Sequence, residues 1–366
     1  MPIDVDFPLP FAAGRPLPQR VERARRRGVD WSTEHRLIRP TDASIGYFLD
    51  MRLADVATGF CPEADGPDLD VMTDVITWTA VCDDFFDGPA GDDPGSAEAA
   101  VLALSSLTGP DGPAAVPHGV EALAGATADL WARMRAPMSP AWQARAARNW
   151  RRFLRSFLAE ADARRDRTVP DLAGYLALRR ETMAMYVYLD AAERTGRYEV
   201  PERVLTDPAL LRLSTLQIDI LAHCNDVHSL EHEEARGDTH NLVLVLEQKG
   251  GRSRGEVIEE IRDRVGRLVV RFRRGADGIP ALCDRLSCDP AERAATYRHL
   301  TALTRQLRVT YDWSLATTRY TQHATSGRRP EYLEASAGRS GASADRADLP
   351  RDGRPGLVPQ QFGEAR

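Results

Sequence analysis

The stretch VMTDVITWTAVCDDFFDGP, residues 71–89, joins an apolar helical pattern to a cluster of carboxylates. Apolar residues recur in it at the spacing of one α-helical face, at Val71, Val75, Trp78, Cys82 and Phe85. The pattern runs into Asp83, Asp84 and Asp87, which enclose Phe85 and Phe86. Like charges this close repel one another, and each costs free energy if it leaves water without a partner. The stretch therefore predicts a helix whose carboxylates need cationic partners.

The same helical spacing recurs along the chain, whereas strand patterns are scarce. A long helix is expected to begin at Asp207 and Pro208 and to end at Gly237. Further helices are expected around residues 43–59, 116–135, 171–195, 254–275 and 290–318. We therefore predict an all-α fold.

The domain organisation is expected to be simple, with one domain over residues 1–324. Its opening residues, 1–15, are punctuated by proline and glycine and carry Phe7 and Phe11, which is typical of an extended arm. Residues 325–366 are rich in Gly, Ser, Ala, Pro and charge and have few large apolar side chains. This composition predicts a disordered tail.

Composition narrows the class of protein. Of the 366 residues, 43% are apolar and 28% are charged, which is ordinary for a soluble globular protein. The formal net charge of −6 argues against binding to nucleic acid or to an anionic membrane surface. The chain has no run of 18 apolar residues, and its start lacks a signal-peptide pattern. We therefore expect a cytoplasmic protein without a membrane span.

Cysteine and lysine usage excludes several kinds of chemistry. The 5 cysteines form no CxxC pair, which indicates reduced thiols rather than disulfides or a zinc site. The single lysine, Lys249, lies in a turn-like Lys-Gly-Gly context. A phosphate-binding P-loop needs a lysine after a glycine run, and Schiff-base enzymes need a buried lysine. ATP-loop and pyridoxal-type enzymes are therefore excluded.

A second set of oxygen donors lies in NDVHSLEHE, residues 225–233. Asn225, Ser229 and Glu233 are four residues apart, which places an amide, a hydroxyl and a carboxylate in a row on one helical face. Such hard oxygen ligands suit Mg²⁺, which usually keeps several waters and binds substrate phosphates. Either cluster alone is also typical of a solvated helix surface. Two clusters in helices with apolar neighbours favour a metal site.

The two clusters together resemble the motifs of bacterial class I terpene synthases. Residues 83–87 match the family's Asp-rich motif, and the row of oxygen donors on 225–233 matches its Asn/Ser/Glu triad. Arg179 lies 46 residues before Asn225, which is the position of the family's diphosphate-sensing arginine.

Two further features extend the resemblance. The family ends in an Arg-Tyr pair after a helix that carries a tryptophan, and Arg319, Tyr320 and Trp313 match this pattern. The segment EEARGDTHNLV, residues 233–243, is also similar to the family. The matching features span residues 83–320, which is most of the chain expected to fold.

The resemblance implies a helical bundle with a deep apolar cavity, whose mouth binds Mg²⁺ and the diphosphate of a linear isoprenoid. Three metal ions are expected there. Asp83 is implied to bind two of them, with Asp87 as a further ligand, and the triad is implied to hold the third. Asp84 is expected to pair with an arginine when the mouth closes.

The family's diphosphate contacts fall on several residues of this chain. Arg179, Arg319 and the Tyr320 hydroxyl are expected to stabilise the charge that develops on the departing diphosphate. His232, beside Glu233, is expected to contact the diphosphate, with a charge that depends on pH.

The cavity is also expected to stabilise a carbocation. It must exclude water, and aromatic faces can hold positive charge without attacking it. The candidate aromatic residues are Phe85, Phe86, Trp78, Tyr186 and Trp313, although this spacing is equally typical of plain core. Thr182 and Met183 follow the sensor arginine where relatives bring the backbone close to the reacting carbon. Met183 is bulkier than the small residue that relatives often carry there.

The activity that the resemblance implies is Mg²⁺-dependent cyclisation of farnesyl diphosphate to a sesquiterpene. A diterpene synthase that uses geranylgeranyl diphosphate is the first alternative. A chain-elongating prenyltransferase would need a second DDxxD motif in place of residues 225–233, and a non-catalytic isoprenoid-binding protein would not need intact motifs. The expected partner is the isoprenyl diphosphate substrate, and a homodimer is left open.

Overall fold

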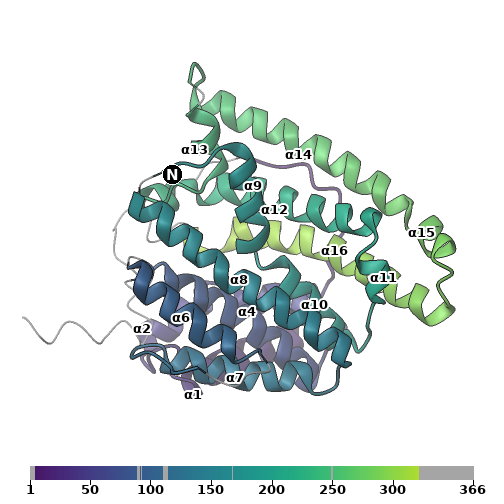
Figure 1. Cartoon of the computed structure of the whole chain (residues 1–366), viewed down its shortest axis with the longest axis horizontal. Helices are drawn as coiled ribbons and strands as arrows, with labels where there is room; N and C mark the ends of the chain where they lie inside the picture. Colours follow the sequence, from purple (N-terminus) through teal and green to yellow (C-terminus); the bar gives the residue numbers. More distant parts are fainter. Residues whose placement is uncertain are drawn as a thin grey trace, which may run out of the picture.

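The computed structural model of the chain describes residues 5–88, 91, 93–109, 114–166, 168–248 and 250–320. Within these residues every regular element is a helix (Figure 1), which confirms the predicted all-α fold. The tail predicted at residues 325–366 lies outside the described residues. None of the described helices is long and apolar enough to cross a lipid bilayer.

The helices form one bundle around a shared core. The first half of the chain forms α1 (Pro18–Glu34), α2 (Asp42–Asp50), α3 (Leu53–Phe60), α4 (Gly66–Phe86), α6 (Pro94–Ser106), α7 (Glu121–Arg135) and α8 (Pro140–Asp166). The second half forms α9 (Leu172–Thr182), α10 (Met185–Gly196), α11 (Glu202–Leu205), α12 (Pro208–Arg236), α13 (Leu242–Glu247), α14 (Arg254–Asp277), α15 (Ile279–Arg285), α16 (Pro290–Ala316) and the 3₁₀ helix η1 (Thr318–Tyr320). In Figure 1, α1 and α7 lie at one side of the bundle and α14 at the opposite side, with α4, α10, α12 and α16 between them.

The long helix α12 begins and ends where the sequence predicts. Asp207 caps its start, since Asp207 Oδ1 accepts a hydrogen bond of 2.8 Å from the backbone N–H of Ala209, and Pro208 occupies the first position. Gly237 ends the helix at a φ of 78°, a left-handed conformation that glycine adopts without a steric cost. The two caps fix the helix that carries the second set of oxygen donors.

Two helices predicted as continuous are each broken in two. The expected helix 43–59 is interrupted at Arg52, with a φ of 57°, and the expected helix 171–195 is interrupted at Ala184, with a φ of 54°. A left-handed residue other than glycine costs about 1–2 kcal/mol. The apolar periodicity continues across both breaks, so the sequence pattern does not reveal the left-handed residue at either position.

The break at Arg52 allows a stability prediction. Arg52→Gly is expected to raise the free energy of unfolding by about 1 kcal/mol, because glycine has no Cβ to clash in the left-handed conformation. The ion pair that is lost, with Asp55 at 3.2 Å, is partly exposed and contributes little. Chemical denaturation measures the change, with the exposed helical substitution Arg26→Gly as a control that should lose about 1 kcal/mol. A loss of stability in both variants would contradict the prediction.

Helix α4 forms the centre of the core. It packs against α1, α3, α7 and α10. Trp78 on α4 stacks on Trp150 of α8, and Phe86 stacks on Phe157, each pair with ring centroids 4.4 Å apart. Burial of an aromatic side chain of this size contributes on the order of 2–3 kcal/mol. These stacks fix the end of α4, where the carboxylates lie.

Residues 5–9 of the extended arm lie against α12 and α16. Phe7 is buried, and its backbone N–H donates a hydrogen bond of 2.8 Å to the Tyr311 hydroxyl of α16. The Val5 carbonyl lies 3.2 Å from Nε2 of His228 on α12. The arm therefore connects α12, which carries the triad, to α16.

Candidate active site

A cavity of about 190 Å³ opens between the helices of the bundle, with contributions from α3, α4, α8, α9, α10, α12, α16 and η1. One part of its wall is apolar, with Leu53, Val56, Phe60, Ile76, Ala80, Phe153 and Met185. Another part is charged or polar, with Asp83, Asp87, Glu160, Arg164, Arg179, Asn225, Glu233, Arg319 and Tyr320. The cavity thus combines apolar and charged side chains that come from helices far apart in sequence.

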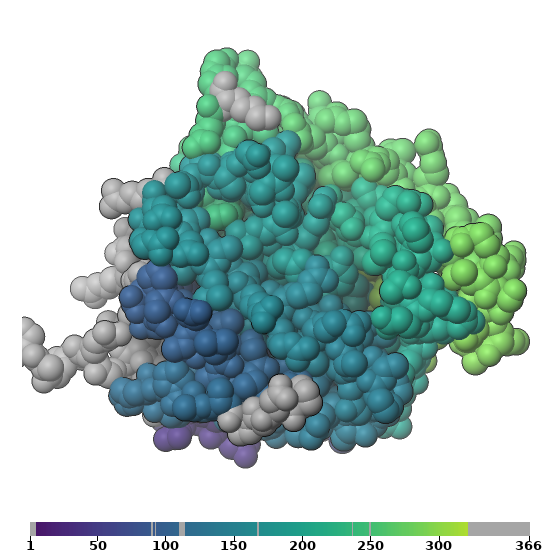
Figure 2. Space-filling model, viewed as in Figure 1, coloured from purple at the N-terminus to yellow at the C-terminus, as the bar shows by residue number. Residues whose placement is uncertain are grey.

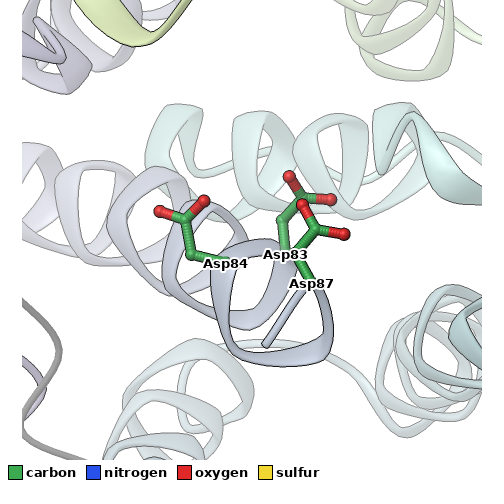
Figure 3. A group of neighbouring side chains, drawn as sticks. All are labelled: Asp83, Asp84 and Asp87. Carbon is green, nitrogen blue, oxygen red and sulfur yellow. The ribbon is translucent and has the colours of Figure 1, made fainter. Parts of the chain in front are cut away.

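The Asp-rich cluster lies at the end of α4. Asp83, Asp84 and Asp87 can each offer one carboxylate oxygen within 4.8 Å of the others. Figure 3 shows Asp83 and Asp87 pointing to the same side of the helix, whereas Asp84 points away from them. Residues four apart share a helical face, so Asp83 and Asp87 line the cavity and Asp84 does not. This geometry makes Asp83 and Asp87 the candidate metal ligands of α4.

Asp84 has a different role in the structure. It is buried, and its Oδ1 accepts a hydrogen bond of 2.6 Å from Nη2 of Arg319. The same guanidinium nitrogen donates to Asp83 Oδ2 at 2.5 Å. Arg319 therefore partly neutralises the cluster and ties η1 to α4, and it is the arginine partner expected for Asp84.

The triad forms one connected network on α12. Ser229 Oγ donates to Glu233 Oε1 at 2.7 Å, and Asn225 Nδ2 donates to the Tyr320 hydroxyl at 2.7 Å. Asn241, just before α13, donates from Nδ2 to Glu233 Oε2 at 2.9 Å. Burial, with the nearby Asp226 carboxylate as a second cause, raises the pKa of Glu233 to about 7. A cation beside this carboxylate would relieve the cost of its burial.

Arg179 is held at the end of α9 by α12. Its Nη2 donates to Asn225 Oδ1 and to Asp226 Oδ1, both at 2.7 Å, and its Nη1 donates to Thr182 Oγ1 at 3.2 Å. Asp226 is fully buried, and its Oδ2 also accepts from the Tyr175 hydroxyl and from the backbone N–H of residue 242, both at 2.6 Å. Asp226 thus fixes the orientation of the arginine.

The sequence reasoning missed Asp226 and Tyr175. A signal for both is present, because Tyr175 precedes Arg179 by one helical turn and Asp226 directly follows Asn225. Asp226 lies off the face that carries the triad, which is why the ligand pattern does not include it.

Two charged residues of α8 also face the cavity and were missed. Glu160 and Arg164 are four residues apart, the ordinary pattern of an exposed helical ion pair. Burial, then repulsion from Asp83 and Asp87, raises the pKa of Glu160 to about 8. Arg164 lies 3.6 Å from Asp87, and its Nε is buried without a hydrogen bond among the described residues.

His240 adds a neutral imidazole to the charged region. Burial, then the positive charges of Arg179 and Arg164, lowers the pKa of His240 to about 4. His232, predicted from its place beside the triad, also lines the cavity, and its ring centroid lies 6.4 Å from that of Tyr320.

Some of the residues predicted for the cavity wall line the cavity, and others do not. Thr182, Met183 and Trp313 line the cavity, beside the helix break at Ala184. Trp313 is held there by a hydrogen bond of 2.7 Å from its Nε1 to the Met51 carbonyl.

The expectation that Trp78, Phe85, Phe86 and Tyr186 form the wall does not hold in this structure. The cavity face of α4 consists of Ile76, Thr79, Ala80, Asp83 and Asp87. At 100° per residue Trp78 and Phe86 point elsewhere, into the stacks with α8, and Trp78 Nε1 donates to the Thr127 hydroxyl at 2.8 Å. Phe85 packs edge-on against Phe86, with ring centroids 5.2 Å apart. The aromatic wall is instead built from Phe60, Phe153 and Tyr188, with Trp313.

Comparison with known proteins agrees with this geometry. Residues 74–271 match the family model for terpene synthase family 2, C-terminal metal binding. The chain is 36% identical over 338 residues to pentalenene synthase of Streptomyces avermitilis, covering 91% of this chain and 98% of the relative. It is 34% identical to a (−)-β-caryophyllene synthase of Saccharothrix espanaensis, covering 93% and 96% of the two chains.

Solved structures show the same fold. The crystal structure of germacradien-4-ol synthase from Streptomyces citricolor superposes with a TM-score of 0.74 at 30% identity, covering 86% of this chain and 99% of the other. Linalool/nerolidol synthase from Streptomyces clavuligerus gives a TM-score of 0.74 at 30% identity, covering 85% and 100%. The helical bundle, the metal-binding family model and the full-length relatives establish that the chain belongs to the bacterial class I terpene synthases, lyases that act on diphosphates.

Proposed function

We propose that this terpene synthase converts farnesyl diphosphate into a sesquiterpene and releases diphosphate. The observation that carries the proposal is a single cavity that is lined both by carboxylates and arginines and by apolar side chains. A substrate with a charged head and a long hydrocarbon chain is complementary to both sets of side chains. Two relatives, a (−)-β-caryophyllene synthase and a 7-epi-α-eudesmol synthase, are named as enzymes that cyclise (2E,6E)-farnesyl diphosphate.

The residues present fit Mg²⁺ as the cofactor. The candidate ligands are all oxygen donors, and the raised pKa values of Glu233, about 7, and of nearby Glu160, about 8, reflect a cost of desolvation that a neighbouring cation would relieve. We propose that Asp83 and Asp87 bind Mg²⁺ from α4, and that Asn225, Ser229 and Glu233 bind it from α12, with three ions in all. Bound Mg²⁺ would stabilise the negative charge of the diphosphate.

The arginines and Tyr320 are proposed to bind the diphosphate directly. Nε of Arg179 is buried and, like Nε of Arg164, has no hydrogen-bond acceptor among the described residues. A buried donor left unpaired costs about 1–3 kcal/mol, and a phosphate oxygen would remove that cost. Arg319 and Tyr320 are anchored beside the same region by Asp84 and Asn225, so their donors need little reorganisation.

The apolar chamber is proposed to protect the carbocation that forms when the carbon–oxygen bond breaks. Water that reached this cation would trap it, and the apolar side chains leave water few partners. The rings of Phe60, Phe153, Tyr188 and Trp313 can stabilise positive charge through their faces. His232 is proposed to contact the diphosphate, and Thr182 and Met183 to contact the reacting end of the chain.

Incubation with single substrates tests the proposal. Purified protein is given Mg²⁺ with geranyl, farnesyl or geranylgeranyl diphosphate, and products are identified by gas chromatography and mass spectrometry. We expect sesquiterpene and diphosphate from farnesyl diphosphate, and no turnover in excess chelator because the buried carboxylates then face the diphosphate without a cation. Restored activity on return of Mg²⁺ is the control. Diterpene from geranylgeranyl diphosphate alone, a longer diphosphate, or full activity in chelator would each contradict the proposal.

A further inference from the structure

Two hydroxyl groups meet in the wall of the cavity. Thr79 of α4 and Tyr188 of α10 both line it, and their hydroxyl oxygens lie 2.7 Å apart. Thr79 is buried, whereas the Tyr188 side chain is partly open to the cavity. The Phe60 ring lies beside the pair, with its centroid 5.6 Å from that of Tyr188. A polar pair in an otherwise apolar wall needs an explanation.

Either hydroxyl could donate in the bond that joins the pair. Thr79 has a single hydroxyl proton, and the Ile76 carbonyl, 2.9 Å from its oxygen, is a second acceptor for it. When Thr79 donates to this carbonyl, the bond between the two hydroxyls uses the Tyr188 proton. Burial raises the pKa of Tyr188, so the phenol keeps this proton and can donate it. The Tyr188 oxygen therefore has lone pairs that accept no hydrogen bond from the described residues.

The position of the pair relates this oxygen to the reacting end of the substrate. Thr79 precedes Asp83 by four residues on the cavity face of α4, a rise of about 6 Å along the helix. The Tyr188 oxygen thus lies about one helical turn further into the cavity than the carboxylates. On the proposed function, a diphosphate held at the carboxylates would place the first carbons of the isoprenoid chain at this depth.

We propose that the Tyr188 oxygen, with its proton held by Thr79, is a specificity-determining group that stabilises positive charge on the isoprenoid near its ionised end. The oxygen is the negative end of the phenol dipole, and its attraction for a cation is strong in a chamber of low dielectric. Intermediates that place their charge near this oxygen are favoured over those that place it elsewhere. The proposal rests on the proposed function and adds the group that selects among its products.

Two conservative substitutions test the orientation of the pair. Tyr188→Phe removes the oxygen and keeps the ring. Thr79→Val keeps the oxygen but removes its acceptor, so the phenol proton is free to point into the cavity and reverse the local dipole. We expect each variant to change the ratio of major to minor products by about tenfold, because 1.4 kcal/mol between competing intermediates corresponds to a factor of ten.

A nearby tyrosine provides the matched control. Tyr186, two residues before Tyr188 on α10, lies outside the cavity lining and places its ring against the Arg152 guanidinium, 5.5 Å away. Tyr186→Phe is therefore expected to leave the product ratio unchanged. Thermal denaturation of all variants verifies that each is folded, and a small Tm shift does not alter a product ratio.

The outcomes separate the inference from the proposed function. If the wild-type protein turns over no isoprenyl diphosphate, the proposed function fails. If the wild-type protein is active and Thr79→Val keeps its product ratio, the orientation of the phenol is irrelevant and the inference is overturned, even when Tyr188→Phe changes the ratio through shape. A ratio change in both variants, with none in Tyr186→Phe, supports the inference.

Discussion

Asp83→Asn is expected to lower turnover of the isoprenyl diphosphate by about a thousandfold, equivalent to about 4 kcal/mol in the barrier. The substitution removes the charge from a candidate ligand that points into the cavity beside Asp87 (Figure 3). An amide is a weak ligand for Mg²⁺ compared with a carboxylate, so the charge that develops on the diphosphate loses its principal stabilisation from α4.

The fold of this variant should be retained. Asp83 is 43% exposed at its side chain, and its described partner, Arg319, keeps the buried Asp84 as a second acceptor at 2.6 Å. We therefore expect the free energy of unfolding to stay within about 1 kcal/mol of the wild-type value. Asp84→Asn provides the contrast, because it weakens the buried pair and should cost more stability.

Steady-state kinetics at increasing Mg²⁺ and chemical denaturation measure the two effects separately. The matched control is Asp263→Asn, which removes an exposed carboxylate of α14 and should leave turnover unchanged. Turnover of Asp83→Asn within tenfold of the wild type would show that Asp83 is not a principal metal ligand.

The triad could be predicted from the sequence because it lies within one helix. Residues 225–233 are a continuous stretch of α12, so a period of four residues is enough to place the three oxygen donors on one face. Arg179 was predicted from a spacing, and the structure places its Nη2 2.7 Å from Asn225 Oδ1.

The wall of the cavity could not be predicted in the same way. Helix α4 is buried on almost every side, so its apolar pattern does not reveal which face meets the cavity and which meets α8. Trp78 and Phe86 were therefore assigned to the wall although they belong to the aromatic stacks. The place of Tyr188 in the wall could not be predicted, because its neighbours in space, Phe60 and Thr79, lie more than a hundred residues away in sequence.

Arg145→Met, the second large prediction, is expected to lower the free energy of unfolding by about 3–5 kcal/mol at pH 8. Arg145 of α8 bridges two buried carboxylates of α10, with its Nε 3.1 Å from Asp190 Oδ1 and its Nη2 2.6 Å from Glu193 Oε2. The side chains of Asp190 and Glu193 are 3% and 1% exposed. Methionine fills the space but leaves two buried carboxyl groups without a cation.

The loss should depend on pH. Burial is the main cause that raises the pKa of Glu193 to about 8, from an ordinary value of 4.5, and burial also raises that of Asp190. Between pH 4.5 and about pH 8, Glu193 keeps a proton in the folded state that it has released in the unfolded state. The free energy of unfolding therefore falls as pH rises through this window. Burial, then the positive charge of Arg145, lowers the pKa of His299 to about 4, so this imidazole beside Glu193 is neutral in the wild-type protein.

Without Arg145 both carboxylates hold their protons more tightly, so the fall in stability with pH becomes steeper than in the wild type. Denaturation at pH 5.5 and pH 8.5 therefore separates the loss of a cation from the loss of packing. A packing defect lowers the free energy of unfolding equally at both pH values. Two carboxyl groups without a cation lower it much less at pH 5.5, where both can be protonated. The exposed Arg165, paired with Asp162 and Asp166 on the surface of α8, provides the control, since Arg165→Met should change stability by less than about 1 kcal/mol at either pH. An equal loss for Arg145→Met at the two pH values would mean that its charge is not what stabilises the bundle.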